Sequence, residues 1–131
     1  MPLSQQKYNE FSSILEKFCL DLGMTVFETG PCKFFCYDAN NSIWSAEFCG
    51  YPSAIVSFEE YKHKIWIYPK LTECRGDKIL LEGDIELSDN SNLYYYKKVI
   101  KNTIQKYKNF LISKKLDKID KDFQWSSLLN N

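Results

Sequence analysis

The first part of the chain carries apolar residues at helical spacing. They are separated by 3, 4, 3 and 4 positions: Tyr8, Phe11, Leu15, Phe18 and Leu22. This spacing predicts an amphipathic helix over about residues 4–22. Ser4 can cap its first turn, with Leu3 and Tyr8 at the spacing of a hydrophobic staple. Gly23 suits the left-handed residue that ends such a helix.

The middle of the chain is rich in β-branched and aromatic residues and is divided by turn signals. We expect strands over residues 24–28, 33–38, 42–48, 54–58, 64–68 and 79–87. Ala39-Asn40-Asn41 predicts a hairpin between the second and third of these, and Pro69 ends the fifth. Residues 69–78 hold either one further short strand or none. Short strands with tight connections favour an antiparallel meander.

A second helical pattern begins near Asp89 to Ser91, any of which can cap it. Its apolar positions are spaced by 3, 4, 4, 3 and 4 residues: Leu93, Tyr96, Ile100, Ile104, Tyr107 and Leu111. We expect this helix to dock on the sheet and to reach about Asp120. The last residues are again apolar and are expected to pack back on the body: Phe123, Trp125, Leu128 and Leu129. The fold class is therefore α+β: an antiparallel meander of about five to six strands, with an N-terminal helix and a long C-terminal helix packed on it, in a single domain over residues 1–131.

Composition adds constraints on compartment and chemistry. Apolar residues make up 44% of the chain, yet no apolar run is long enough to cross a membrane. The first residues lack the pattern of a secretory signal, so we expect a cytoplasmic protein with no membrane partner. Five cysteines, an odd number, favour reduced thiols. Cys32 and Cys36 lie on one expected strand, about 13 Å apart, which is too far for a disulfide or a shared zinc. We expect no metal and no cofactor.

Charge is unevenly distributed along the chain. Residues 1–96 hold 8 basic and 14 acidic side chains, a balance of −6, whereas residues 97–131 hold 9 and 3, a balance of +6. Four lysines fall on one side of the expected second helix: Lys97, Lys101, Lys108 and Lys115. Such a ridge could follow a phosphate backbone, or its lysine stems could cover the flank of a docked helix. The single arginine, Arg75, and the zero net charge favour the second interpretation.

Three carboxylates alternate along the expected strand 79–87. Glu82, Asp84 and Glu86 would share one face of it, spaced by about 6.6 Å. Such a row can be the solvated face of a sheet, a recognition surface for a basic partner, or a catalytic or metal-binding pair. Glu59 and Glu60 could extend a recognition surface.

Aromatic residues lie on both sides of several elements. Some of these must face away from the core: Phe35, Tyr37, Trp66, Tyr68, Tyr94 and Tyr95. They could fill a second core or anchor a partner. We expect Trp66 and Tyr68 to bind a partner together with the carboxylates.

Motifs for catalysis are missing from the sequence. His63, the single histidine, stands between Lys62 and Lys64 in an expected turn. The sequence contains no phosphate-binding loop, dinucleotide fingerprint or nucleophile elbow. We therefore expect a binding protein and not an enzyme.

This combination resembles the small immunity proteins of bacterial toxin–immunity systems, including those of contact-dependent growth inhibition. The resemblance lies in the helix–sheet–helix order, the acidic strand, the additional aromatic residues and the lack of a catalytic motif. It implies a protein that binds and neutralises one cognate toxin. The Lys-, Asn- and Ile-rich composition is typical of a bacterial or phage source.

Two alternatives remain at this point. FSSILEKFCLDLGM is similar to the opening helix of type III secretion chaperones, and residues 79–111 are similar to their closing strand and helix. That resemblance implies an effector protein as the partner. A nucleic-acid-binding domain is the other alternative, and it would depend on the lysines.

Overall fold

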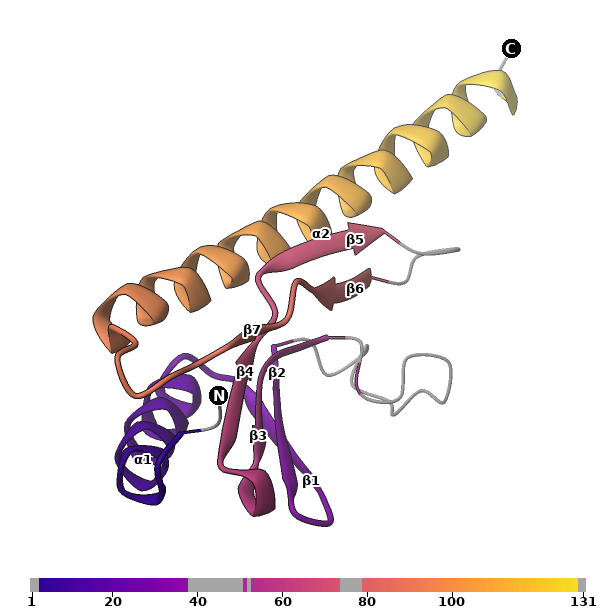
Figure 1. The fold of residues 1–131 in the computed structure, drawn as a ribbon. Helices are drawn as coiled ribbons and strands as arrows, with labels where there is room; N and C mark the ends of the chain where they lie inside the picture. Colours follow the sequence, from indigo (N-terminus) through magenta and orange to yellow (C-terminus); the bar gives the residue numbers. More distant parts are fainter. Residues whose placement is uncertain (1–2, 38–50, 52, 74–78, 130–131) are drawn as a thin grey trace.

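The computed structural model describes residues 3–37, 51, 53–73 and 79–129, with side chains of the last helix as far as Leu116. Two helices flank the strands: α1 (Gln5–Asp21) and α2 (Leu93–Leu129). An antiparallel sheet has the order β1 (Thr25–Thr29), β2 (Cys32–Cys36), β3 (Ala54–Glu59), β4 (Lys64–Ile67) and β7 (Ile85–Glu86). A second sheet pairs β5 (Lys70–Glu73) with β6 (Ile79–Glu82). The predicted α+β fold with an N-terminal helix and a long C-terminal helix is confirmed (Figure 1).

Helix α1 begins and ends as its sequence predicts. The Ser4 side chain accepts a hydrogen bond from the Lys7 backbone N–H at 3.3 Å. Gly23 has a φ of 86°, and the next N–H, of Met24, donates to the Cys19 carbonyl at 3.1 Å. The same carbonyl also accepts the Leu22 N–H at 3.2 Å, so the last turn of the helix is closed by backbone hydrogen bonds. The start of α1 is tied to distant residues: Leu3 N–H donates to the His63 carbonyl, and Ser4 N–H to the Asp89 carboxylate, each at 2.9 Å.

Strands β1 to β4 form the expected meander. Gly30, with a φ of 59°, turns β1 into β2, and a short 3₁₀ helix (Glu60–Lys62) followed by His63 turns β3 into β4. His63 adopts a left-handed φ of 51°, which is uncommon for a side chain with a Cβ atom. The expected strand 42–48 and its hairpin lie outside the described residues. Strand β2 pairs with β1 on one side and β3 on the other.

The prediction of one continuous strand over residues 79–87 is wrong. Gly83 has a φ of 91°, a left-handed conformation that interrupts an extended chain. Strand β6 therefore ends at Glu82 and pairs with β5, whereas β7 starts at Ile85 and pairs with β4. Strand β5 also settles the open assignment of residues 69–78, because Lys70–Glu73 form a strand.

Both helices pack on one face of the main sheet. The Tyr8 ring of α1 meets Phe58 of β3 edge-on at 6.4 Å, and Tyr107 of α2 meets Tyr37 at 5.8 Å. Between these contacts lies the core, whose fully buried members include Leu15, Phe35, Val56, Ile65, Ile67, Ile100 and Tyr107.

Helix α2 is longer than its sequence predicts. Its first turn is capped by Asn92, whose side-chain oxygen accepts the Tyr95 N–H at 3.3 Å, one residue beyond the expected window of 89–91. Its 37 residues span about 55 Å. The expectation that the last residues pack back on the body is wrong, because the backbone stays helical to Leu129 and its yellow end projects away from the sheet (Figure 1).

Candidate partner-binding surface

The predicted row of three carboxylates is divided between the two sheets. Glu82 lies opposite Lys70 in the β5–β6 pair, where the Thr72 hydroxyl donates to its carboxylate at 2.6 Å. The Lys70 ammonium is 3.9 Å from the same oxygen. Asp84 lies in the link between the sheets and is exposed. Glu86 lies in β7, within the main sheet. A single acidic strand face is therefore not formed, because Gly83 changes the direction of the chain.

Strand register nevertheless brings four of the expected binding residues onto one face. Trp66 lies opposite Ser57 on one side and Glu86 on the other, and Glu59 lies opposite Lys64. Directly paired residues of antiparallel strands share a face. Tyr68 joins them, because its hydroxyl is 2.7 Å from the Ser57 hydroxyl.

This face is the one turned away from the helices. Phe58 and Lys33, which alternate with its residues, contact Tyr8 and Glu16 of α1. Successive strand residues point to opposite sides, so Ser57 and Phe34 face away from α1. We call this side of the main sheet, over β1, β2, β3, β4 and β7, the outer face.

Five half-buried aromatic side chains lie on the outer face: Phe27, Phe34, Tyr51, Trp66 and Tyr68. The Tyr51 ring is 5.0 Å from both the Phe27 and the Phe34 ring, and its hydroxyl is 3.3 Å from that of Thr29. Side chains of this kind offer large apolar area together with a polar group, a combination enriched in interface hot spots.

Three carboxylates lie near Trp66 and Tyr68: Glu59, Asp84 and Glu86. The pKa of the Tyr68 phenol is raised to about 12, mainly by burial; its hydrogen bond to Ser57 lowers it, and the negative charges of Asp84 and Glu59 raise it. Asp84 therefore acts electrostatically on the outer face, although it does not belong to a strand. Glu59 is 3.9 Å from Lys62, and Glu86 is 3.7 Å from Lys64. The two lysines partly neutralise the negative charge of these carboxylates. We call Glu59, Asp84 and Glu86 the rim of the outer face.

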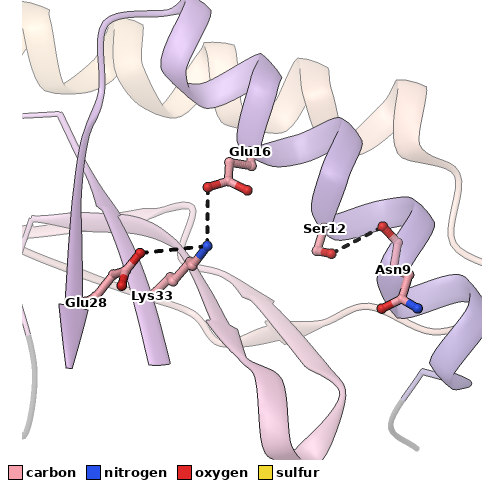
Figure 2. Close-up of polar contacts among 5 residues, drawn as sticks. All are labelled: Asn9, Ser12, Glu16, Glu28 and Lys33. Carbon is pink, nitrogen blue, oxygen red and sulfur yellow. Dashed lines mark hydrogen bonds and ion pairs between the residues drawn. The ribbon is translucent and has the colours of Figure 1, made fainter. Parts of the chain in front are cut away.

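Glu60, the remaining expected binding residue, lies on the other side of the sheet. It lines a cleft of about 130 Å³ between α1 and the strands, together with Tyr8, Asn9, Ser12, Glu16, Pro31, Lys33 and Phe58. Figure 2 shows Lys33 between two carboxylates, 3.4 Å from Glu16 and 3.8 Å from Glu28. The Ser12 hydroxyl donates to the Asn9 carbonyl at 3.3 Å (Figure 2). The ion pair between Lys33 and Glu16 joins α1 to the sheet across this cleft. Glu60 therefore lies on a different surface from Glu59, which belongs to the outer face.

Lysines of α2 lie over aromatic rings of neighbouring elements. The ammonium groups of Lys97 and Lys101 are 5.4 and 5.8 Å from the centre of the Phe18 ring. That of Lys108 is 5.8 Å from the Tyr37 ring. This is the geometry of lysines that cover the flank of a docked helix and form cation–π contacts there.

Two of the described thiols have raised pKa values. Burial raises the pKa of Cys19 to about 12. Burial and Glu59 also raise the pKa of Cys32, although Lys62 lowers it. Thiols with raised pKa values are poor nucleophiles at neutral pH. Within the described ranges, no three His, Cys, Asp or Glu residues are placed to hold a metal ion.

Sequence reasoning missed Phe27, Phe34 and Tyr51 as residues of the outer face. The Gly30-Pro31 turn sets the register of β1 and β2 and so places Phe27 opposite Phe34. The position of this turn in the sequence is the signal that could have identified the pair. Of the aromatic residues singled out earlier, Phe35 and Tyr37 pack on the helix side. Trp66 and Tyr68 lie on the outer face.

Comparison with protein-family models, with curated proteins and with solved structures found no match to this chain. None of the helices, as far as they are described, has the length and apolar character that a bilayer span requires.

Proposed function

We propose that this chain is a non-enzymatic, cytoplasmic protein-binding module, an immunity protein that neutralises a cognate bacterial toxin. The observation that carries the proposal is the outer face, where Trp66, Tyr68 and three further aromatic side chains are bordered by Glu59, Asp84 and Glu86. Aromatic anchors with a polar rim are the usual composition of a protein-binding surface.

Charge supports a basic protein as the partner. The balance of −6 over residues 1–96 attracts a positively charged surface, such as the cleft of a toxin that acts on nucleic acid. The contacts of Lys97, Lys101 and Lys108 with aromatic rings favour a structural use of those lysines over phosphate binding. We therefore prefer a protein partner to nucleic acid.

Protonation supports binding over catalysis. The phenols of Tyr8 and Tyr68 have pKa values of about 12, above their ordinary value of 10.0. Burial is the main cause in both cases. Neither phenol is activated as a nucleophile, because the raised pKa opposes the loss of its proton.

The test uses the polypeptide encoded directly upstream of this gene, where a toxin gene is expected. Cells producing that polypeptide should stop growing, and production of this chain should restore growth. Calorimetry should show that the purified pair binds. Trp66→Ala should raise the dissociation constant by about tenfold or more, as expected for a hot spot. Tyr61→Ala is the matched control, because Tyr61 is 62% exposed and lies in the 3₁₀ helix. A neighbouring product that neither inhibits growth nor binds this chain would refute the proposal.

A further inference from the structure

The cleft between α1 and the strands has the size of a small ligand. Helix α1 contributes Tyr8, Ser12 and Glu16, which are spaced by four residues and so lie along one side of the helix. Strands β2 and β3 contribute Lys33 and Phe58, which are directly paired and face α1. The cleft volume is about 130 Å³. An engineered cavity of roughly 150 Å³ holds one benzene molecule, so a group of about six non-hydrogen atoms fits here.

Backbone hydrogen bonds connect the walls of this cleft. Its third wall is the start of the 3₁₀ helix, where the Glu60 N–H donates to the Pro31 carbonyl at 3.1 Å. The residue after the 3₁₀ helix, His63, accepts the Leu3 N–H at the start of α1. Because the walls are already tied together, a ligand would have to order few groups when it binds.

Charge around the cleft favours a cation. The Lys33 ammonium lies between Glu16 and Glu28, at 3.4 and 3.8 Å, so two carboxylates share it (Figure 2). With Glu60 the balance of these four side chains is 1 − 3 = −2. No ion pair between described residues uses the Glu60 carboxylate. An anion would be repelled here, whereas a positively charged group would be attracted.

Tyr8 adds a polar group whose surroundings are almost fully buried. Its side chain is only 6% exposed, and its hydroxyl has no hydrogen-bond partner within the part of the chain that the structure describes. The pKa of this phenol is raised first by burial and then by nearby charges that include Glu60 and Glu16, so the hydroxyl end of the ring lies near both carboxylates. Buried hydroxyls usually have a partner, and a ligand in the cleft would provide one.

The shape and chemistry of the lining indicate which cation. The rings of Tyr8 and Phe58 meet edge-on at 6.4 Å, and both line the cleft. A guanidinium is flat, stacks on aromatic rings and carries several N–H donors in one plane, whereas an ammonium is compact and strongly hydrated. Among the described residues, no three His, Cys, Asp or Glu side chains are placed to hold a metal ion.

We propose that this cleft binds one guanidinium group, with the Glu16 and Glu60 carboxylates and the Tyr8 hydroxyl as its hydrogen-bond acceptors. The group is either a small free guanidine or the end of an arginine side chain. This inference depends neither on the outer face nor on the proposed toxin partner, because the cleft lies on the helix side of the sheet.

The test is an NMR titration of the isotope-labelled full chain with methylguanidinium chloride, at millimolar concentrations that do not unfold proteins. The backbone N–H signals of Asn9, Ser12 and Glu60 should shift and saturate. Glu60→Gln should raise the dissociation constant by about tenfold or more, because a charged acceptor is lost, and Tyr8→Phe should raise it by about fivefold. Glu60 is exposed and Tyr8→Phe keeps the ring, so both variants should fold.

Glu10→Gln is the matched control, because Glu10 also lies on α1 but pairs with Lys7 outside the cleft. Its dissociation constant should equal that of the wild type. No saturable shift in the wild type, or shifts that Glu60→Gln and Tyr8→Phe leave unchanged, would overturn the proposal.

Two further ligands define the chemistry and its source. Butylammonium should bind about tenfold more weakly than methylguanidinium, and equal binding would overturn the assignment to a guanidinium. N-acetyl-arginine methylamide carries peptide groups on both sides of the side chain. If it binds as tightly as methylguanidinium, the cleft accepts an arginine of another protein, and if it binds much more weakly, the ligand is a small free guanidine.

Discussion

Trp66 lies directly opposite Glu86 across the β4–β7 pair, and the charged Lys64 side chain contacts both of them. Its ammonium is 5.6 Å from the centre of the Trp66 ring and 3.7 Å from a Glu86 carboxylate oxygen. Strand β7 has only two residues, so these side chains help to hold it on the sheet. The same three residues lie on the outer face, where stability and recognition are therefore linked.

Gly83 should be the most sensitive glycine of the chain as described. A Cβ atom at this position would approach the Lys70 Cβ to 3.3 Å, and the φ of 91° is strained for any residue with a side chain. Gly83→Ala should lower the free energy of unfolding by about 1–3 kcal/mol. Gly23→Ala is the control, since its φ is similar at 86° but nothing lies within 4 Å. Urea unfolding should show a smaller loss for the control, and equal losses would mean that the approach to Lys70 has no effect.

The lysines of α2 should contribute modestly to stability. Replacing Lys97, Lys101 and Lys108 together with Gln removes three cation–π contacts, and we expect the free energy of unfolding to fall by about 1–2 kcal/mol in total. Ile104→Ala alone should cost about 2–5 kcal/mol, because Ile104 is only 6% exposed. Chemical denaturation measures both. Strong, salt-sensitive binding of DNA or RNA that the triple Gln variant abolishes would instead assign these lysines to nucleic acid.

Stability should fall at alkaline pH. The folded-state pKa of Tyr68 is about 12, against 10.0 as its ordinary value. Between these pH values the unfolded chain loses the phenolic proton and the folded chain keeps it. The free energy of unfolding is therefore unaffected by this group below pH 10 and decreases above pH 10, by up to roughly 2–3 kcal/mol. Cys19, raised from 9.0 to about 12 by burial, acts in the same direction from about pH 9.

Tyr68→Phe separates this effect from packing. At pH 7 the free energy of unfolding of the variant should be lower by about 1 kcal/mol, because Ser57 loses the partner of its 2.7 Å hydrogen bond. Its stability should then decline less steeply than that of the wild type above pH 10. Parallel pH profiles for the two proteins would show that Tyr68 does not titrate as described.

Charge reversal on the rim of the outer face should slow association with the proposed toxin partner. Glu59→Lys/Asp84→Lys/Glu86→Lys removes attraction to a basic surface, so the association rate constant should fall about tenfold or more at low salt and less at high salt. Glu86→Lys also places a lysine beside Lys64, so melting must be measured in parallel. Glu82→Lys is the control, because Glu82 lies in the other sheet. Unchanged kinetics in a folded variant would move the binding surface away from this rim.

Local sequence signals predicted the elements whose causes are local. Ser4, the apolar stripe and Gly23 defined α1 almost to the residue, since caps and helical spacing act within a few positions. The carboxylates were placed wrongly, because alternation in Glu82, Asp84 and Glu86 suggests a strand whether or not Gly83 turns the chain. The outer face required the pairing of five strands, and such register is set by contacts between distant residues.

The prediction for the end of α2 was wrong for a related reason. Apolar residues after Asp120 suggested a segment that returns to the body, whereas the backbone shows a continuous helix. Sequence spacing identifies an apolar stripe but does not say whether the sheet of the same chain or another molecule covers it.

The tie between the start of α1 and Asp89 has a consequence for synthesis on the ribosome. The Ser4 N–H finds its carboxylate 85 residues later in the chain, so the first helix cannot complete its docking until most of the protein has been made. At typical translation rates the delay is on the order of 4–17 s. Until then the start of α1 has the bond from Leu3 to the His63 carbonyl but lacks the one from Ser4 to Asp89.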